Sequence, residues 1–287
     1  MGDDAALLPG GRLLCCDALA EGVHFRWDWS APEDVGWKAV AANVADILAM
    51  GGLPDTAVWS VGMGADWSDA TFDGLSRGAL DACKAYGCSL VGGDTVRCKG
   101  PGFVSLALLG AVATEKPWVR SGVRPGDHLA VAGELGYSAA GLAALLEGSS
   151  GCDGAERFVS MHRRPRPPME QAMWLRSLPV GAAIDLSDGL ASEAAHLALA
   201  SGVSIVLDTA SLAPSPALVA FAGTLRIDPM DWILYGGEDH SLLVALPEGV
   251  AVPPGVRVVG RAEEGSGVQL STGAHREPLA PRGWSHS

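Results

Sequence analysis

The stretch "AIDLSDGL" (residues 183–190) places two carboxylates, Asp185 and Asp188, three residues apart between an apolar segment and a helix-like one. An apolar run that ends in an acidic, glycine-containing turn and continues as a helix is typical of the strand-to-helix passage in an α/β protein. We therefore expect both carboxylates at the end of a buried strand, where ligands of α/β proteins commonly bind.

The same alternation of strand-like and helix-like segments runs through the first half of the chain. We expect "RLLCCDAL" (12–19) to form a strand that runs into a loop at Asp17. Ser30 is the expected N-cap of the next helix, which a glycine pair at 51–52 ends. Further strands are predicted at 56–63 and 104–113, with a helix at 68–87 and a short strand in "CSLVGGDT" (88–95) that stops in a Gly-Gly-Asp turn.

A polar, proline-bearing stretch, "EKPWVRSGVRPGDH" (115–128), separates this half from a second one. With 287 residues, 48% of them apolar and only 18% charged, the chain is long enough for two packed cores. We place the boundary near residue 117, which gives domains at 1–117 and 118–287. The second is expected to open with a strand in "HLAVAG" (128–133) and a glycine-entered helix in "GYSAAGLAALLEG" (136–148).

Composition excludes several classes of protein. A net charge of −13 disfavours nucleic acid or an anionic membrane as the main partner, because both are bound through clustered Lys and Arg. The longest apolar run, at 104–113, has about half of the ~20 residues that a membrane-spanning helix needs. No basic segment followed by an apolar one opens the chain, which favours a cytoplasmic location. The six cysteines lack CxxC spacing and are expected to be reduced packing residues.

Acidic residues recur in glycine-rich or apolar settings at the expected ends of strands. They are Asp3, Asp4, Asp17, Asp94, Asp185, Asp188, Glu238 and Asp239. Asp46 differs because it lies inside a helix of Ala, Val, Ile and Asn, where an unpaired carboxylate is costly. Shared cations explain such a set economically. Oxygen ligands with almost no Cys or His suit Mg²⁺ better than Zn²⁺, and Mg²⁺ commonly completes its shell with substrate phosphates. The pattern therefore points to phosphoryl chemistry.

Each of these signals also has an ordinary structural explanation. A single Asp-Gly is more often a turn residue than a ligand, and a glycine pair more often a sharp turn. His24 and Trp284 taken alone are more often packing residues, and "HRRPRPP" (162–168) is more often a solvated basic loop than an anion site. The sequence contains no Gly-Lys dipeptide and hence no P-loop, and no protein-kinase motifs, so another architecture is needed.

Taken together, the motifs resemble the thiamine-monophosphate kinase family over essentially the whole chain. They are "GDDAALL", "CDALAEGVHF", "GWKAVAANVADILAMGGLP", "VGGDT", "RSGVRPGD", "HRRPRP", "AIDLSDGL", "YGGED" and "GWSH". "EGVHF" and "NVADILAMGG" separate the chain from the synthetases and hydrogenase-maturation proteins that share the fold. The resemblance implies transfer of the γ-phosphoryl group of ATP to thiamine monophosphate, which yields thiamine diphosphate.

The resemblance also implies roles for individual residues. The metal set for several Mg²⁺ ions would be Asp4, Cys15, Cys16, Asp17, Asp46, Asp94, Asp185 and Asp188, although the family usually has hydroxyl residues at positions 15 and 16. ATP would contact Tyr86, Gly93, Asp94, Arg120 and Ser187. Thiamine monophosphate would contact His24, Glu238 and Trp284. A phosphate monoester with a second pKa near ~6 is largely deprotonated at neutral pH and needs no general base, so we expect direct transfer and assign no residue as covalent nucleophile.

The implied fold is the two-domain α/β (α+β) arrangement of aminoimidazole ribonucleotide synthetase-like proteins. The N-terminal domains of a homodimer would form a β-barrel, the C-terminal domain would be α/β, and ATP would bind between the domains. No nucleic acid or membrane partner is expected. The family carries a further helix and strand before "GDDAALL", and we expect loss of such a segment to loosen Asp4. Two alternatives stay open: another ATP-dependent enzyme of the same superfamily, or a non-catalytic protein that binds thiamine phosphates or nucleotide.

Overall fold

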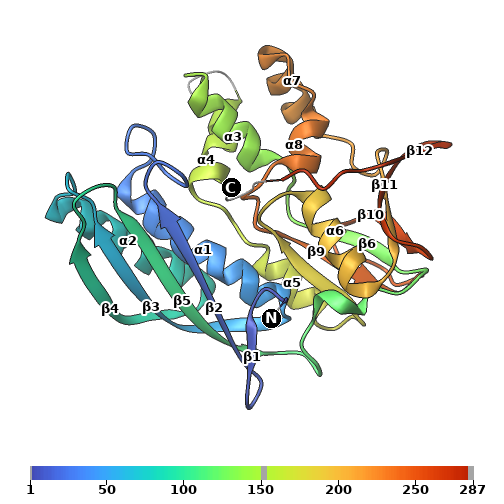
Figure 1. Cartoon of the computed structure of the whole chain (residues 1–287), viewed down its shortest axis with the longest axis horizontal. Helices are drawn as coiled ribbons and strands as arrows, with labels where there is room; N and C mark the ends of the chain where they lie inside the picture. The colour runs from blue at the N-terminus through green and yellow to red at the C-terminus, as the bar shows by residue number, and fades with distance from the viewer. Residues whose placement is uncertain (1, 150–153, 284–287) are drawn as a thin grey trace.

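The computed structural model describes residues 2–149 and 154–283, which form two domains, each built on one β-sheet (Figure 1). The first sheet and its helices comprise β1 (Ala6–Leu8), β2 (Arg12–Ala20), α1 (Pro32–Ala49), β3 (Gly52–Met63), α2 (Asp69–Tyr86), β4 (Ser89–Arg97) and β5 (Phe103–Val112). A short 3₁₀ helix, η1 (Arg120–Gly122), follows. The second set comprises β6 (His128–Ala132), α3 (Tyr137–Leu146), α4 (Ala155–Arg163), α5 (Met169–Leu175), β7 (Ala182–Leu186), α6 (Leu190–Ser201), β8 (Ser204–Asp208), α7 (Pro216–Leu225), α8 (Pro229–Tyr235), β9 (Ser241–Leu246), β10 (Val256–Glu263), β11 (Gly267–Thr272) and β12 (His275–Pro278).

The first sheet has the order β1-β2-β5-β3-β4 and is antiparallel except for the parallel β3–β4 pair. Alternate residues of β5, at 104, 106 and 108, are fully buried under the helices. Several large apolar side chains on these strands are exposed: Leu7, Leu14, Leu53, Val58, Val91 and Val96. Within the residues described, the sheet is open and does not close into a barrel.

Helices α1 and α2 approach each other at backbone contact. A Cβ atom on Gly78 would lie 1.9 Å from the Glu33 carbonyl oxygen, and one on Gly36 would lie 2.0 Å from that of Leu75. Only glycine fits at both positions, so this pair of helices depends on two residues that a propensity scale would count against a helix.

The second sheet has the order β12-β11-β8-β10-β6-β9-β7, and only β8 and β11 are parallel. Alternation along β9 divides its residues between two cores. Leu242 and Val244 pack in the core that contains α1 and the first sheet, whereas Leu243 packs in the core of α3, α6 and α8. Thirteen of the 18 residues of α1 are buried, because this one helix is covered by both sheets.

Three local predictions are wrong, two of them because pairing with another strand outweighs the local pattern. Strand β2 does not leave the sheet at Asp17 but pairs with β5 as far as Ala20. Strand β4 continues through the expected Gly-Gly-Asp turn, since its parallel pairing with β3 extends to Arg97. Helix α1 has Ala31 rather than Ser30 as its N-cap, and Asp34 Oδ2 accepts a hydrogen bond from the Ala31 N–H at 3.1 Å.

Other sequence predictions are confirmed. Ser68 caps α2 by accepting a hydrogen bond from the Thr71 N–H at 3.2 Å, and α3 begins after Gly136 as expected. Cys15, Cys83 and Cys88 are buried, but Cys16 is exposed, contrary to the expectation of packing cysteines; Cys152 lies outside the described residues. Among the described helices, none is both long and apolar enough to cross a membrane.

Candidate active site

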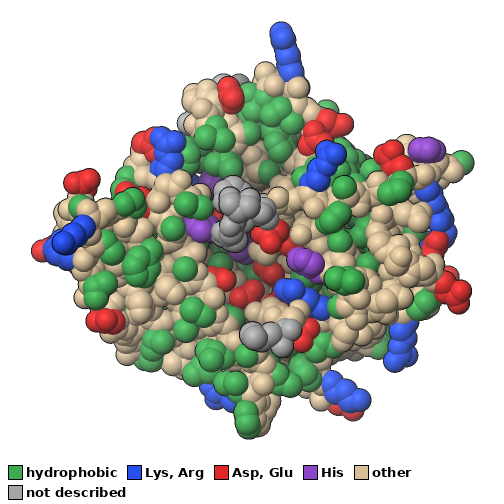
Figure 2. All heavy atoms as spheres, viewed as in Figure 1, with side chains coloured by type: hydrophobic (Ala, Val, Ile, Leu, Met, Phe, Trp, Pro, Cys, Tyr) green, Lys and Arg blue, Asp and Glu red, His purple; other side chains and the backbone are tan. Residues whose placement is uncertain are grey.

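Three carboxylates from distant parts of the chain meet between the two domains. Asp4 precedes β1, Asp46 lies on α1 and Asp185 lies in β7, and one carboxylate oxygen of each lies within 4.8 Å of the others. Asp17 of β2 lies near this group, because the charge of Asp185, after burial, raises its pKa. Figure 2 shows acidic side chains gathered in a hollow between the two halves, with histidine and basic side chains at its border. Three of the acidic residues singled out from the sequence thus lie together at this position.

Burial and mutual repulsion make this group unfavourable in its fully ionised form. Burial, followed by the charge of Asp185, raises the pKa of Asp4 to about 7. Burial, followed by the neighbouring carboxylates, also raises the pKa values of Asp46 and Asp17. Asp4 Oδ2 is buried without a hydrogen-bond partner in the described part of the chain. A cluster of oxygen donors with an unsatisfied buried lone pair fits Mg²⁺, which prefers carboxylate oxygens.

The Arg120 guanidinium offsets part of the charge, and the imidazole of His240 lies beside Asp185. The Arg120 guanidinium contacts Asp4, and the backbone N–H of Arg120 donates a hydrogen bond to Asp3 Oδ1 at 2.9 Å. His240 Nδ1 lies 3.6 Å from Asp185 Oδ2, and although burial lowers its pKa, Asp185 raises it above the ordinary value overall. Asp4 is therefore tied to η1 by an ion pair.

The turn after β7 is fixed by a residue that sequence reasoning missed. Glu193, on α6, exposes only 2% of its surface, and its Oε1 accepts a hydrogen bond from the Asp188 N–H at 3.0 Å. Burial, followed by the charge of Asp185, raises the pKa of Glu193 to about 9. Its only sequence signal was an acidic residue in the first turn of a helix. The turn is thus held in place by a carboxyl that is protonated at neutral pH in the absence of cations.

The "YGGED" segment is tied to the same turn through its backbone. The Glu238 N–H donates to the Ser187 carbonyl at 2.7 Å, and the His240 N–H donates to that of Leu186 at 2.9 Å. Glu238 and His240 both have positive φ, 61° and 50°, which is uncommon for residues other than glycine. Asp239 between them accepts from the N–H groups of Gly136 and Ser138 and so caps the start of α3. The motifs "AIDLSDGL" and "YGGED", which were predicted separately, are thus joined by backbone hydrogen bonds.

Glu238 also contacts two residues that the sequence prediction did not include. Its carboxylate lies 3.1 Å from Lys38 Nζ and 3.5 Å from His162 Nδ1. The signal for Lys38 was the single lysine of α1, which lies between the apolar residues Trp37 and Ala39. The prediction of a solvated basic loop at 162–168 is wrong, because His162 is buried and Arg164 Nε pairs with Asp34 Oδ1 at 2.5 Å.

The remaining predicted residues lie at varying distances from the carboxylate group. His24 Nδ1, in the loop after β2, accepts from the Ala20 N–H at 3.1 Å. Tyr86 ends α2, and burial raises its pKa. Gly93 and Asp94 lie on the exposed edge strand β4, and neither is part of the three-carboxylate group. Trp284 lies outside the described residues.

The two cysteines predicted near metal point in opposite directions. Cys15 Sγ is buried 3.4 Å from Asn43 Oδ1, and burial, followed by the charges of Asp46 and Asp17, raises its pKa, so the thiol is neutral. Cys16 Sγ is exposed 3.5 Å from Ser105 Oγ. A neutral thiol is a poor ligand for Mg²⁺, so any metal contact at these positions depends on backbone oxygens or water.

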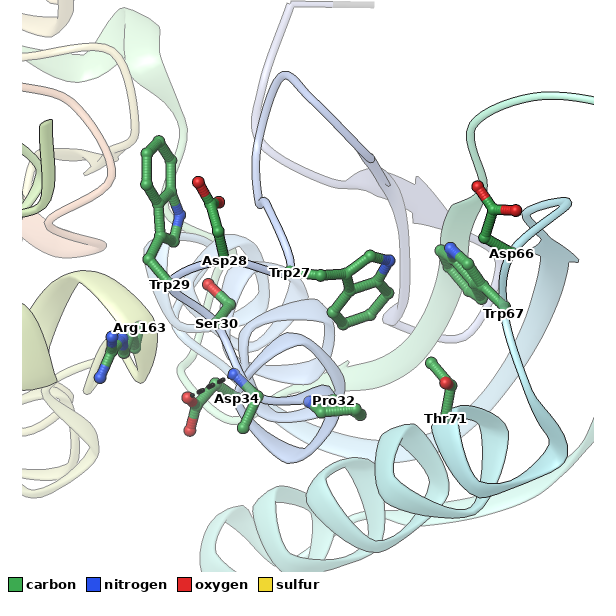
Figure 3. Close-up of a pocket in the computed structure, with 11 residues that line it drawn as sticks. Trp27, Asp28, Trp29, Ser30, Pro32, Asp34, Asp66, Trp67, Thr71 and Arg163 are labelled. Atoms are coloured by element: carbon green, nitrogen blue, oxygen red, sulfur yellow. Dashed lines mark hydrogen bonds between the residues drawn. The ribbon is translucent and has the colours of Figure 1, made fainter.

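An aromatic groove of about 620 Å³ adjoins the start of α1 (Figure 3). Trp29 lies on the side of Arg163, whereas Trp27 lies toward Trp67. The indole N–H groups of Trp27 and Trp29 are buried without a partner among residues 2–149 and 154–283, and Asp34 lies at the rim. The aromatic faces that line such a groove can hold a heteroaromatic or cationic group.

Known proteins resemble this chain along most of its length. Residues 2–112 match the model of the AIR synthase related protein N-terminal domain. Thiamine-monophosphate kinase of Mycobacterium tuberculosis is 41% identical over 271 residues, which cover 92% of this chain and 79% of that protein. The same enzyme of Aquifex aeolicus is 36% identical over 291 residues, covering 100% of this chain and 92% of that protein. The solved structure of AaThiL complexed with AMPPCP and TMP superposes with a TM-score of 0.91 at 34% identity, covering 100% of this chain and 92% of that one. The expected aminoimidazole ribonucleotide synthetase-like, two-domain α/β fold is confirmed.

Proposed function

The chain belongs to the thiamine-monophosphate kinase family, and from this premise we propose that it transfers the γ-phosphoryl group of ATP to thiamine monophosphate. The observation that carries the proposal is the meeting of Asp4, Asp46 and Asp185 between the domains, at the place where the family resemblance expects a nucleotide. The AMPPCP and TMP bound to the similar AaThiL structure support both substrates. The products are thiamine diphosphate and ADP.

We propose that Mg²⁺ is held by the carboxylates of this group, with Asp17, Asp94 and Asp188 as further ligands and positions 15 and 16 beside them. When bound, Mg²⁺ neutralises the phosphate charges and aligns the reacting oxygens. The protein supplies the rest. Arg120 adds positive charge beside Asp4, and the N-terminus of α6, which follows the turn that contains Ser187, favours an anion through its helix dipole. Tyr86 and Gly93 complete the proposed contacts with ATP.

The chemistry requires no base or covalent intermediate from the protein. The acceptor is a phosphate monoester whose second pKa is near ~6, so it is largely deprotonated at neutral pH. The barrier is repulsion between two anions. We therefore propose direct in-line transfer, with His24, Glu238 and Trp284 on the acceptor.

The proposal includes a division into domains at 1–117 and 118–287 and a homodimer built through the first sheet. The support is an open sheet with exposed apolar side chains, among them Leu14, Leu53 and Val58. Contiguous exposed apolar surface commonly marks a protein interface. Pairing of two such sheets would give the barrel that the family resemblance implies.

Product formation from ATP, Mg²⁺ and thiamine monophosphate, followed by chromatography, tests the function. Thiamine diphosphate that appears with the monophosphate, but not with thiamine or without acceptor, supports the kinase. ATP turnover that requires a different acceptor would favour another enzyme of the superfamily. Tight binding of both ligands without product would favour a non-catalytic binding protein.

A further inference from the structure

A lysine is buried in the middle of an apolar helix. Lys38 exposes only 3% of its surface, and its neighbours Val35, Ala39 and Ala42 on α1 are buried. An ammonium group in this environment is costly unless an anion pairs with it. Its Nζ lies 3.2 Å from Oε1 and 3.1 Å from Oε2 of Glu238, so one carboxylate from the other domain balances its charge.

The Glu238 carboxylate is constrained on a second side by His162. The His162 Nδ1 lies 3.5 Å from Glu238 Oε2 and 3.0 Å from Ser138 Oγ. Burial, followed by the charge of Lys38, lowers the pKa of His162 to about 3, so its ring is neutral. Lys38 is therefore the charged group in direct contact with this carboxylate among the described residues.

Charge near Glu238 outweighs the effect of burial on its pKa. Burial alone would raise the pKa of Glu238, but the adjacent charge of Lys38 contributes most to lowering it below the ordinary value. His240 lies on the same segment and faces Asp185. Glu238 is therefore ionised at neutral pH.

The accessible part of the pair is the carboxylate and not the ammonium. The Glu238 side chain is 28% exposed, whereas that of Lys38 is 4% exposed. A carboxylate repels a nearby phosphate group, but it accepts hydrogen bonds from N–H donors and attracts cationic groups. The pair thus offers a fixed acceptor of hydrogen bonds at the border of the site.

We propose that Lys38 is a positioning residue that fixes the Glu238 carboxylate, and that the fixed carboxylate recognises the amino-bearing ring of the acceptor rather than its phosphate. The inference rests on the proposed function, because the contact of Glu238 with the acceptor comes from there. It adds Lys38, from the first domain, to the residues that act in acceptor recognition, and it names the amino-bearing ring as the group that Glu238 binds.

Titration calorimetry with thiamine monophosphate, in the presence of Mg²⁺ and AMPPCP, tests the pair without turnover. Lys38→Met, which stays apolar and fits the helix, should weaken affinity at least about tenfold. Lys38→Arg should recover part of the loss. In a Glu238→Gln background the same Lys38→Met change should add no more than about twofold, because the carboxylate it positions is gone. The KM for ATP should stay within about twofold of the wild-type value in Lys38→Met.

Thiamine serves as a probe that lacks the phosphate. If the pair recognises the ring, Lys38→Met should weaken thiamine and thiamine monophosphate by the same factor; a loss confined to the monophosphate would overturn this assignment. Arg77→Met is the matched control. Arg77 lies on α2 and pairs at 2.6 Å with Glu33, which lies on α1 like Lys38. The control variant should leave both affinities unchanged.

Two results would overturn the positioning role: unchanged affinity in Lys38→Met, or losses from the two substitutions that multiply as independent effects do. The outcome is separable from that of the proposed function. Wild-type protein that binds thiamine monophosphate without phosphorylating it would refute the kinase and leave the binding test valid. Wild-type protein that binds neither thiamine nor its phosphate would overturn both.

Discussion

In the absence of metal, the protein should lose stability as the pH rises, and Asp4 gives the size of the effect. Its side chain is 1% exposed, and its pKa is raised from 3.8 to about 7, chiefly by burial. Between pH 3.8 and about 7, Asp4 is therefore protonated in the folded state and ionised in the unfolded state. Its contribution to stability is greatest below pH 3.8 and is lost as the pH rises toward 7. At 1.36 kcal/mol per unit of pKa, Asp4 alone should cost about 4 kcal/mol.

Urea unfolding followed by circular dichroism, at pH 4 and pH 8 in EDTA, measures this loss. Asp4→Asn removes the titrating group, so the free energy of unfolding of the wild type relative to Asp4→Asn should fall by about 4 kcal/mol between the two pH values. Mg²⁺ should restore the wild type at pH 8 and have little effect at pH 4, where the ligands are protonated. Asp69→Asn is the control, because that side chain is 93% exposed. The reasoning is refuted if the wild type and Asp4→Asn show the same pH dependence in EDTA.

Three further predictions concern catalysis, nucleotide binding and assembly. Asp46→Asn should lower kcat by orders of magnitude while the circular dichroism spectrum stays native; unchanged turnover at saturating Mg²⁺ would rule out Asp46 as a metal ligand. Gly93→Ala should destabilise the protein by about 1–3 kcal/mol and raise the KM for ATP, because the new Cβ would lie 2.2 Å from the Trp59 carbonyl oxygen. Gly92→Ala, which meets nothing within 4 Å, should do neither, and equal melting temperatures of the two variants would contradict the argument. Val58→Glu places a charge on the exposed face of the first sheet and should give monomers in light scattering, whereas a dimer that persists would exclude this face as the interface.

Local signals in the sequence predicted the helices better than the ends of the strands. The start of α2 was predictable because its cap, Ser68, acts within one turn. The ends of β2 and β4 were not predictable from local signals. The end of β2 is decided by pairing with β5, which is distant in sequence, and β4 continues in its pairing with β3 through a glycine pair that is typical of a turn. Gly93 was expected in a turn, but it is required by the close approach of β3.

For the site, the sequence indicated which residue types take part but not which of them meet. Acidic residues at strand ends predicted a cation site, and Asp4, Asp46 and Asp185 do come together. Lys38 was missed because its partner, Glu238, is 200 residues away and nothing local to α1 indicates an anion. Asp94 shows the converse, since its motif is clear but the structure places it on an exposed edge strand, outside the three-carboxylate group.

The burial of α1 between both sheets also bears on how the protein moves and unfolds. Separating the domains would expose the apolar residues of α1 and of β9, such as Leu242 and Val244, that share one core, at roughly 1.5–3 kcal/mol for each side chain fully exposed. Wide hinge opening is therefore costly. For the same reason the two domains should melt in a single transition, because neither retains a complete core once the helix that they share is gone.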